Sequence, residues 1–306
     1  MPTIGRFAPS PSGRMHLGNV LCALLAFLSA RRQNGQFLLR IEDLDAMRCP
    51  RSFADLILDD LRWLGLDWDG EVPYQSERAS IYEQYEAILR KKGLLYPCFC
   101  SRAALHAASA PHLSDGRVLY AGTCRDLTPA QVAEKRKSRA PATRVRVPDE
   151  VVQFTDEVWG EYAENLAAEC GDFIVRRSDG VFAYQLAVVV DDALTGVNEV
   201  VRGADLISST PRQIWLHRLF GFVPPRFAHL PLLCDHDGRR LSKRDEDLDL
   251  GLLRQRFTQE QVIGALACAA GLIDRPEPVA ACELVSSFDW AKVPRHDLFL
   301  PNIFRE

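Results

Sequence analysis

Short apolar runs and helical apolar spacing alternate along the first part of the chain. Residues 3–8 and 36–41 are apolar runs bounded by turn residues, which predicts two buried strands. Residues 17–32 lie between them and have the apolar spacing of a buried helix. The same spacing predicts helices over residues 52–64 and 77–92. A strand–helix–strand order of this kind indicates a parallel, doubly wound α/β sheet.

The second half returns to this pattern. Residues 172–190 have strand character, and the continuous apolar run 187–190 predicts a strand buried on both faces. Residues 210–220 are predicted to form a helix with Pro211 in its first turn, where a missing N–H costs nothing. A further helix is predicted over residues 257–270. We therefore expect a Rossmann-like parallel sheet whose two halves are separated in the sequence.

Between the halves the composition changes. The stretch after residue 95 has three cysteines, several Gly and Pro, and a basic run at residues 135–137. We expect four parts: residues 1–95 and 171–245 as the two halves of the catalytic domain, residues 96–170 as a zinc-containing insertion, and residues 246–306 as a short helical segment.

Composition and charge narrow the class of protein. Of the 306 residues 47% are hydrophobic, enough for a real core, and the net charge of −4 gives no sign of a strongly basic nucleic-acid binder. The apolar stretch 20–30 is too short to span a membrane, and no leader segment precedes it. The nine cysteines are odd in number and scattered, which argues against a disulfide framework. We expect a cytoplasmic protein, and the clustered cysteines suggest a metal.

The strongest chemical signal lies in residues 6–19. The predicted strand is followed by a Pro/Ser/Gly turn and then by His16, Leu17, Gly18 and Asn19 at a helix start. Unpaired backbone N–H groups at a helix N-terminus attract phosphate, and Gly18 lets a nucleotide approach the backbone. His16 and Asn19 can add hydrogen bonds. The plain alternative is a Pro-rich loop with a surface histidine.

A second basic element follows much later in the chain. The segment 239–244 reads Arg-Arg-Leu-Ser-Lys-Arg, so that Lys243 and Arg240 lie in one short loop after Asp237 and Gly238. A mobile cationic loop can neutralise the charge that develops as pyrophosphate leaves. A solvated basic turn is the alternative.

These two segments resemble the signatures of glutamyl-tRNA synthetases, which are class I aminoacyl-tRNA synthetases. The first signature has the general form His-Ile-Gly-His, with Asn19 at its last position, and the second is Lys-Met-Ser-Lys-Ser, with Arg240 at its first lysine and Lys243 at the catalytic one. The stretches 39–45, 182–192, 200–205 and 210–213 also resemble the family. The resemblance implies ATP, with Mg²⁺, bound by His16, Gly18 and Lys243, and catalysis by His16, Asn19 and Lys243.

Residues in and near these stretches can also bind an acidic amino acid. Two arginines can bind carboxylates with bidentate forks, and one acidic residue can pair with the ammonium group. The resemblance implies that L-glutamate is bound by Arg6, Phe7, Ala8, Pro9, Ser10, Glu42, Tyr184 and Arg202. Which arginine holds which carboxylate stays open. The alternative is that Glu42 and Arg202 form a structural ion pair at the sheet edge.

The expected insertion carries a candidate metal site. Cys98, Cys100 and Cys124 are close enough in sequence to suggest one tetrahedral structural zinc, and ligand chemistry favours His106 or His112 as the fourth ligand. Three free buried cysteines are the alternative. Short relatives of the glutamyl-tRNA synthetases, the glutamyl-queuosine tRNA(Asp) synthetases, have a Tyr before the last Cys. That resemblance implies Tyr120 as the ligand.

The number of residues after the lysine loop bears on which tRNA is the acceptor. Residues 245–306 are too few for the helical anticodon-binding body of a glutamyl-tRNA synthetase, so we expect none. The resemblance to the short relatives implies transfer of glutamate to the queuosine base at the wobble position of tRNA(Asp). Alternatives are charging of the tRNA(Glu) 3′ end, another nucleotidylyltransferase, and a catalytically silent tRNA-binding module. The sequence does not give the oligomeric state, and a monomer is the default expectation.

Overall fold

One six-stranded sheet forms the centre of the molecule. The computed structural model describes residues 2–101, 119–234, 249–300 and 304. The strand order is β2-β1-β8-β9-β5-β6, and neighbours are parallel except for the antiparallel pair β5 and β6. The strands are β1 (Ile4–Phe7), β2 (Gln36–Leu39), β5 (Val151–Asp156), β6 (Gly160–Asn165), β8 (Glu199–Gly203) and β9 (Arg226–Leu230). The expected parallel α/β sheet is confirmed.

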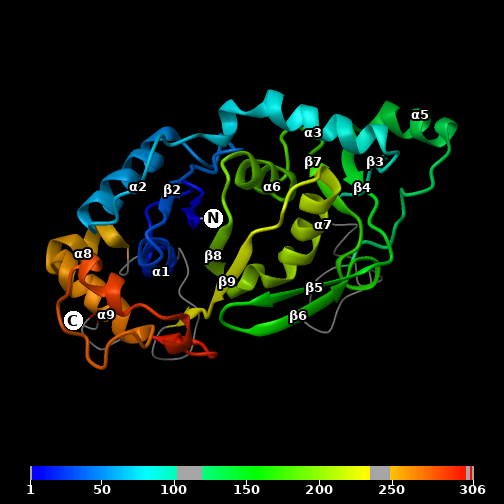
Figure 1. Cartoon of the computed structure of the whole chain (residues 1–306). Helices are drawn as coiled ribbons and strands as arrows, with labels where there is room; N and C mark the ends of the chain where they lie inside the picture. Colours follow the sequence, from blue (N-terminus) through cyan, green and yellow to red (C-terminus); the bar gives the residue numbers. More distant parts are fainter. Residues whose placement is uncertain (1, 102–118, 235–248, 301–303, 305–306) are drawn as a thin grey trace.

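A smaller antiparallel sheet lies at one side of the molecule. It contains β3 (Leu95–Cys98), β4 (Ala142–Val145) and β7 (Phe173–Arg176), and the exposed helix α5 (Pro129–Ser138) extends beside it (Figure 1). The β5–β6 hairpin also comes from the expected insertion 96–170, yet it adds two strands to the central sheet. The segment between the two halves therefore contributes to both sheets.

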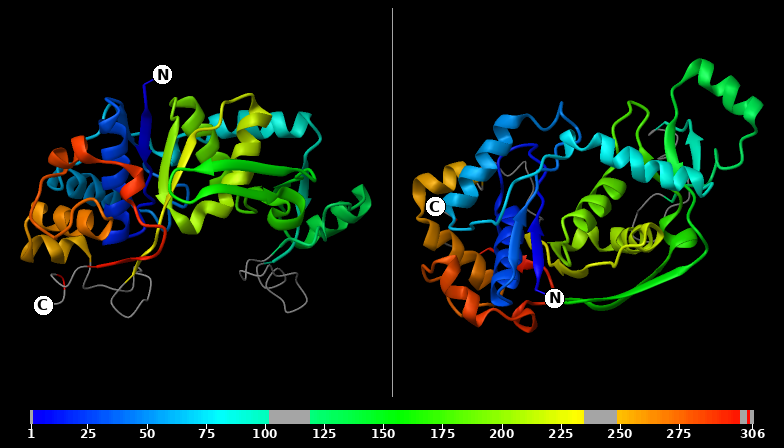
Figure 2. Two further views of the ribbon diagram at one scale, coloured as in Figure 1. Left: turned by 60° about the horizontal axis from the view of Figure 1, so that its bottom comes forward. Right: turned by 45° about the horizontal axis from the view of Figure 1, so that its top comes forward.

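Helices from both ends of the chain cover the first half of the central sheet. Helix α1 (Leu17–Arg32) packs against β1, β2 and β8, and its residues from Val20 to Ala30 are largely buried. Beside it lie α2 (Arg51–Trp63), α8 (Leu250–Arg256), α9 (Gln259–Ala269) and α10 (Ala281–Leu284), at the opposite side from α5 (Figures 1 and 2). A short parallel pair, β10 (Leu233–Cys234) and β11 (Leu298–Phe299), joins this C-terminal part to the sheet. None of the described helices has the length and apolarity that crossing a membrane requires.

The remaining helices correct one prediction. Helix α3 (Ala79–Lys91), α6 (Tyr184–Leu194) and α7 (Thr210–Phe220) pack together beside β7, and α6 contains the run 187–190. The prediction of a buried strand at residues 187–190 is therefore wrong. Every residue from Leu186 to Asp192 is buried, because α6 has neighbours on most of its faces. A helix covered in this way shows no amphipathic period, so its apolar run resembles that of a buried strand. The helix predicted at residues 210–220 is confirmed by α7.

Candidate active site

The turn between β1 and α1 ends in a reciprocal helix cap. His16 is the N-cap of α1, and its Nδ1 accepts a hydrogen bond from the Gly18 N–H at 3.1 Å. The Oδ1 of Asn19 accepts from the His16 N–H at 3.4 Å. Because Nδ1 is an acceptor, the neutral imidazole carries its hydrogen on Nε2. The carbonyl of Asn19 serves the cap, which leaves its amide group as the donor for a ligand.

Gly18 also has a packing role that its sequence position does not reveal. A Cβ at this position would lie 3.0 Å from Cε1 and 3.1 Å from Nδ1 of His16. The missing side chain therefore makes room for the imidazole over the first turn of α1, in addition to any access that it gives to a nucleotide.

A cavity of about 420 Å³ gathers the predicted residues. It lies at the carboxyl ends of β1 and β8, the usual position of ligands in open parallel sheets. The predicted residues that line it are Arg6, Phe7, Ala8, Pro9, Ser10, His16, Gly18, Asn19, Glu42, Tyr184 and Arg202. The phosphate-type turn and the residues predicted for an acidic amino acid thus face one cavity.

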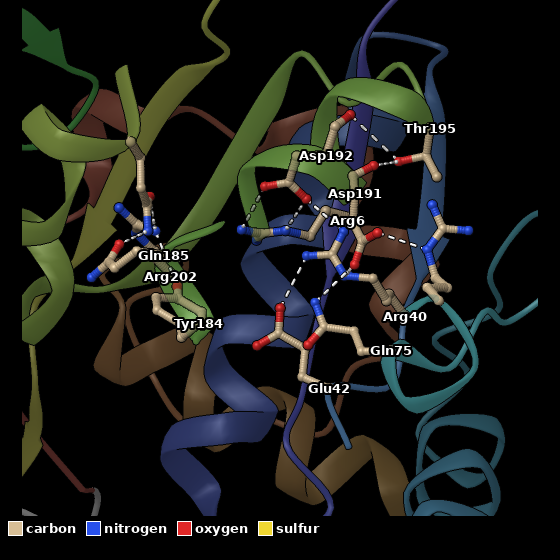
Figure 3. Close-up of polar contacts among 12 residues, drawn as sticks. Arg6, Arg40, Glu42, Gln75, Tyr184, Gln185, Asp191, Asp192, Thr195 and Arg202 are labelled. Carbon is tan, nitrogen blue, oxygen red and sulfur yellow. Dashed lines mark hydrogen bonds and ion pairs between the residues drawn. The ribbon is translucent and has the colours of Figure 1, made fainter. Parts of the chain in front are cut away.

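Two of the cavity-lining charges are held by a buried pair behind them. Asp192 on α6 accepts hydrogen bonds from Nε and Nη2 of Arg6, at 3.3 and 3.5 Å, and from Nη1 of Arg40 at 2.6 Å. Nη2 of Arg40 donates in turn to Glu42 at 3.0 Å. Figure 3 shows these side chains converging from β1, the end of β2 and α6. Arg6 and Glu42, of opposite sign, are therefore positioned by one Asp192–Arg40 pair.

The network continues away from the cavity through the neighbouring residue Asp191. Its carboxylate accepts hydrogen bonds from Gln75 at 2.8 Å (Figure 3), from Arg78 at 2.7 Å and from Tyr82 at 2.7 Å. Arg40 also lies 3.8 Å from it. The start of α3 is thereby fixed to α6, and the charges of the buried network balance.

Burial and charge compete in this network. Burial lowers the pKa of Arg40, but the carboxylates of Asp192, Glu42 and Asp191 outweigh burial, so that the pKa is raised and the guanidinium stays charged. Burial raises the pKa of Asp192, but Arg40 and Arg6 reverse this effect and lower it to about 2. For Glu42 burial prevails over Arg40, and the pKa is raised. Glu42 is thus the carboxylate of the network that most needs a further cation.

Arg202 on β8 is held by five acceptors. Nε donates to Nε2 of His229 at 3.0 Å, Nη1 to Gln213 at 2.7 Å and Tyr184 at 3.3 Å, and Nη2 to Thr210 at 2.7 Å and the Leu206 carbonyl at 3.4 Å. Within the described residues Arg202 forms no ion pair, and burial lowers its pKa. The alternative of a structural pair between Glu42 and Arg202 is wrong, because Glu42 pairs with Arg40.

A second cavity of about 430 Å³ adjoins the first. The two share Ser10, Glu42 and Tyr184 in their linings. Polar groups at the far side include Asp45 and Arg177, which form an ion pair at 3.0 Å. The two cavities are therefore neighbours that meet at these three shared residues.

The three predicted cysteines of the insertion form a cluster. The Sγ atoms of Cys98, Cys100 and Cys124 all lie within 4.8 Å of one another, and those of Cys100 and Cys124 are 3.7 Å apart. Thiolates bound to one tetrahedral zinc at about 2.3 Å would be separated by about 3.8 Å. The Tyr120 hydroxyl lies 3.6 Å from Cys98 Sγ. The donor set and its spacing fit one tetrahedral metal ion.

Electrostatics around the cluster favour thiolate at one position. Burial raises the pKa of Cys98, but the backbone N–H of Cys100 and the guanidinium of Arg144, 3.2 Å away, lower it overall. Burial and the neighbouring thiols raise the pKa of Cys100 to about 11. The pKa values of Cys98 and Cys100 are thus shifted in opposite directions, whereas a bound metal would favour the thiolate at each cysteine.

Several predicted residues lie outside the described part of the chain: Lys243 and Arg240 of the lysine loop, and His106 and His112, the alternative zinc ligands. Sequence reasoning gave no role to Arg40, Asp192, Gln213 and His229. For Asp192 the sequence does contain a signal. Asp191 and Asp192 directly follow an apolar run, and charges in such a position must have buried partners.

Comparison with known proteins agrees with this geometry. Residues 3–261 match the family model "tRNA synthetases class I (E and Q), catalytic domain". A glutamate tRNA ligase from Elizabethkingia meningosepticum, solved in complex with its amino acid, superposes with a TM-score of 0.82 at 27% identity over 98% of this chain and 67% of that one. The glutamate-tRNA synthetase of Elizabethkingia anophelis gives 0.84 at 27% identity over 99% and 69%. The chain belongs to the class I tRNA synthetases.

Relatives of similar length show to which family within this class the chain belongs. A glutamyl-Q tRNA(Asp) synthetase of Symbiobacterium thermophilum is 50% identical over 97% of this chain and 95% of its own length. Proteins of the same name from Nitratidesulfovibrio vulgaris and Neisseria meningitidis are 46% and 44% identical over 97% of this chain, and over 95% and 99% of their own lengths. The chain belongs to the glutamyl-Q tRNA(Asp) synthetase family.

Proposed function

We propose that this protein activates L-glutamate with ATP and transfers the glutamyl group to the queuosine base of tRNA(Asp). The observation that carries the proposal is the joining of the His16 turn and the Arg6–Glu42–Arg202 group in one cavity. The names of relatives at 44–50% identity over nearly the whole chain support the acceptor.

The charges of the cavity suit glutamate. Arg6, Arg40 and Arg78 balance Asp191, Asp192 and Glu42, so Arg202 leaves one positive charge without a direct counterion among the described residues. Glutamate with two carboxylates and one ammonium group has a net charge of −1 at neutral pH. Its ammonium group would pair with Glu42, whose pKa is raised by burial and would fall on contact with a cation.

The two arginines offer donors in different ways. Arg6 uses three of its five N–H groups, on Nε, Nη1 and Nη2, so one N–H on each of Nη1 and Nη2 can form a fork for a carboxylate. Arg202 uses all five, but its two longest contacts, to Tyr184 and Leu206, involve cavity-lining residues. A substrate carboxylate would replace those two contacts. Phe7, Ala8, Pro9 and Ser10 would line the rest of the amino-acid site.

ATP would place its phosphates at the start of α1. The Nε2–H of His16 and the amide group of Asn19 would bind them, Gly18 would let them approach the backbone, and Lys243 would stabilise the departing pyrophosphate. Mg²⁺ bound with ATP would neutralise further charge. The ionised α-carboxylate needs no general base to attack the α-phosphorus. Residues of the site thus act by positioning and charge stabilisation.

Transfer requires a hydroxyl acceptor beside the adenylate. We place the queuosine base in the second cavity, because this cavity shares Ser10, Glu42 and Tyr184 with the first one. Its cyclopentenediol would there reach the activated carbonyl. The polar pair Asp45–Arg177 suits recognition of a hydroxylated base.

Structural zinc completes the proposal. Cys98, Cys100, Cys124 and Tyr120 would hold one zinc ion, which would fix β3 to the loop before α5. A closed set of four protein ligands has no position for a substrate, so this metal would stabilise the fold and take no part in the chemistry.

Two assays test the proposed function. The first measures ATP–pyrophosphate exchange with glutamate, aspartate and glutamine, and the proposal expects exchange with glutamate alone. The second compares glutamate transfer to tRNA(Asp) with queuosine, tRNA(Asp) without it, and tRNA(Glu). Transfer to the queuosine-containing tRNA(Asp) only is expected. Charging of tRNA(Glu) at its 3′ end would instead support a glutamyl-tRNA synthetase, and absence of any exchange would support a silent binding module.

A further inference from the structure

A buried histidine contacts Arg202 from the side opposite the cavity. His229 on β9 is fully buried, and its Nε2 accepts the Nε–H of Arg202 at 3.0 Å. Its Nδ1 lies 2.6 Å from Oδ2 of Asp156, the last residue of β5. Neither His229 nor Asp156 lines the cavity. Three adjacent strands, β5, β9 and β8, thus carry a chain of side chains that ends at the substrate-facing guanidinium.

The contacts of the imidazole determine where its hydrogen lies. Arg202 Nε can only donate, so Nε2 of His229 must be the acceptor. The ring hydrogen therefore lies on Nδ1 and is donated to Asp156, whose carboxylate can only accept. The Oγ1 of Thr210 accepts from Arg202 Nη2 at 2.7 Å and lies 3.1 Å from Nε2, so that its hydroxyl can share this single acceptor with Arg202.

Asp156 is itself held rigidly by backbone groups. Its Oδ1 accepts from the N–H groups of Val158 and Trp159, both at 3.0 Å, in the turn between β5 and β6. Its Oδ2 also accepts from the backbone N–H of His229 at 3.1 Å. A carboxylate that accepts this many N–H bonds stays ionised. Accordingly, although burial raises the pKa of Asp156, its hydrogen-bond donors lower it overall.

We propose that Asp156 and His229 are positioning residues for glutamate binding: Asp156 fixes the Nδ1–H form of His229, and Nε2 of that form fixes the orientation of Arg202. This inference rests on the proposed function, since it gives Arg202 the role of a glutamate carboxylate ligand. A histidine with its hydrogen on Nε2, or with both hydrogens, would point an N–H group at the guanidinium and displace it.

Protonation of the ring is suppressed by its surroundings. Burial lowers the pKa of His229 to about 4, against the opposing effect of Asp156, and the positive charge of Arg202 lowers it further. The neutral ring is therefore present at neutral pH. A neutral acceptor beside Arg202 leaves the charge of the guanidinium for the substrate, which a carboxylate in the same place would neutralise.

Two substitutions at position 229 separate the two hydrogen bonds of the ring. In His229→Gln the amide oxygen takes the place of Nε2 and can accept from Arg202, whereas the donor to Asp156 is lost. In His229→Asn the amide nitrogen takes the place of Nδ1 and can donate to Asp156, whereas the acceptor for Arg202 is lost. Both variants replace the buried ring by a smaller amide side chain, so each is the control for the loss of the ring in the other.

The readout is glutamate-dependent ATP–pyrophosphate exchange. Loss of a hydrogen bond to a charged group predicts a KM for glutamate about tenfold higher or more in His229→Asn and within about threefold of wild type in His229→Gln. The KM for ATP should stay within about twofold in both. Equal KM values for glutamate in the two variants, or a matching rise in the KM for ATP, would overturn the inference. Absence of exchange in the wild type would instead refute the proposed function.

A measurement on the wild-type protein covers the case in which a variant does not fold. In ¹⁵N-histidine-labelled protein at pH 7, the His229 ring should give a pyrrole-type signal for Nδ1 and a pyridine-type signal for Nε2. Its signals are assigned by their loss in His229→Gln, or otherwise from nuclear Overhauser contacts to Phe227, whose ring stacks on the imidazole at 6.0 Å between centroids. A pyrrole-type Nε2, or an imidazolium ring, would contradict the inference.

Discussion

Asp192 binds Arg6 through the edge of the guanidinium formed by Nε and Nη2, at 3.3 and 3.5 Å. This geometry leaves the adjoining edge of the guanidinium, formed by Nη1 and Nη2, for other partners. One N–H of Nη1 donates to the Val201 carbonyl at 3.2 Å. A residue of α6 that does not line the cavity thus determines which edge of Arg6 is left for a carboxylate.

Replacement of Asp192 should affect both binding and stability. Asp192→Asn leaves Arg6 and Arg40 without their shared counterion, and loss of one partner of a buried ion pair costs about 3–5 kcal/mol. Urea unfolding should show a loss of this size, and any folded protein should have a raised KM for glutamate. Glu134→Gln is the control, because Glu134 and Lys137 form an exposed ion pair, which should contribute less than about 1 kcal/mol. Equal effects of the two substitutions would contradict the prediction.

The lysine loop lies outside the described residues, so its role is predicted from the sequence alone. Lys243→Ala should slow adenylate formation by about 10²- to 10³-fold, as expected for the loss of one group that stabilises transition-state charge. Glutamate affinity by calorimetry should stay unchanged. Lys137→Ala on the exposed helix α5 is the control and should leave exchange unaltered. Normal exchange in Lys243→Ala would remove this residue from the mechanism.

Metal analysis tests the fourth ligand of the cysteine cluster. We expect about one zinc per chain in the wild type, loss of zinc in Cys124→Ser, and weakened zinc retention against a chelator in Tyr120→Phe. Cys282→Ser, at an exposed cysteine, should retain the metal. If Tyr120→Phe retains zinc fully and His106→Ala or His112→Ala loses it, that histidine is the fourth ligand.

The stability of the protein should depend on pH through His229. Its pKa of about 4 in the folded protein lies below the ordinary value of 6.5, so between these values the unfolded chain binds a proton that the folded one excludes. The free energy of unfolding should therefore decrease as the pH falls from about 6.5 to about 4, by up to about 3 kcal/mol. Urea midpoints at pH 7 and pH 4.5 should differ less in His229→Gln than in the wild type. His217, whose pKa is also lowered by burial, contributes equally to both proteins. Parallel pH profiles would count against this role of His229.

Local sequence patterns predict much of the fold and many of the residues that line the first cavity. The strand before the phosphate-type turn and the helix after it have clear periods and a strong turn sequence, so β1, α1 and the position of His16 follow from the sequence. The sequence pattern of helix α6 resembles that of a strand, because burial on most faces removes the period that distinguishes the two structures.

The supporting residues could not be predicted in the same way. Arg40 and Asp192 are distant in sequence and meet only because β2 pairs with β1 and Asp192 of α6 lies against Arg6 of β1. His229 and Asp156 depend on the pairing of β5 with β9, which joins the stretch between the two halves to the central sheet. Contacts of this kind are set by tertiary packing, and a single sequence at most marks a charge that must be buried, as at Asp192, without indicating its partner.

The course of the chain through β5 has a consequence for protein engineering. After the cysteine cluster the chain returns to the central sheet and places Asp156 against His229 before it enters β6. A shortened variant in which a plain linker replaces residues 96–170 would therefore lose the strands β4, β5 and β6 and the Asp156 carboxylate behind His229 and Arg202, in addition to the cysteine cluster. The peripheral stretch and the amino-acid cavity must be transplanted together.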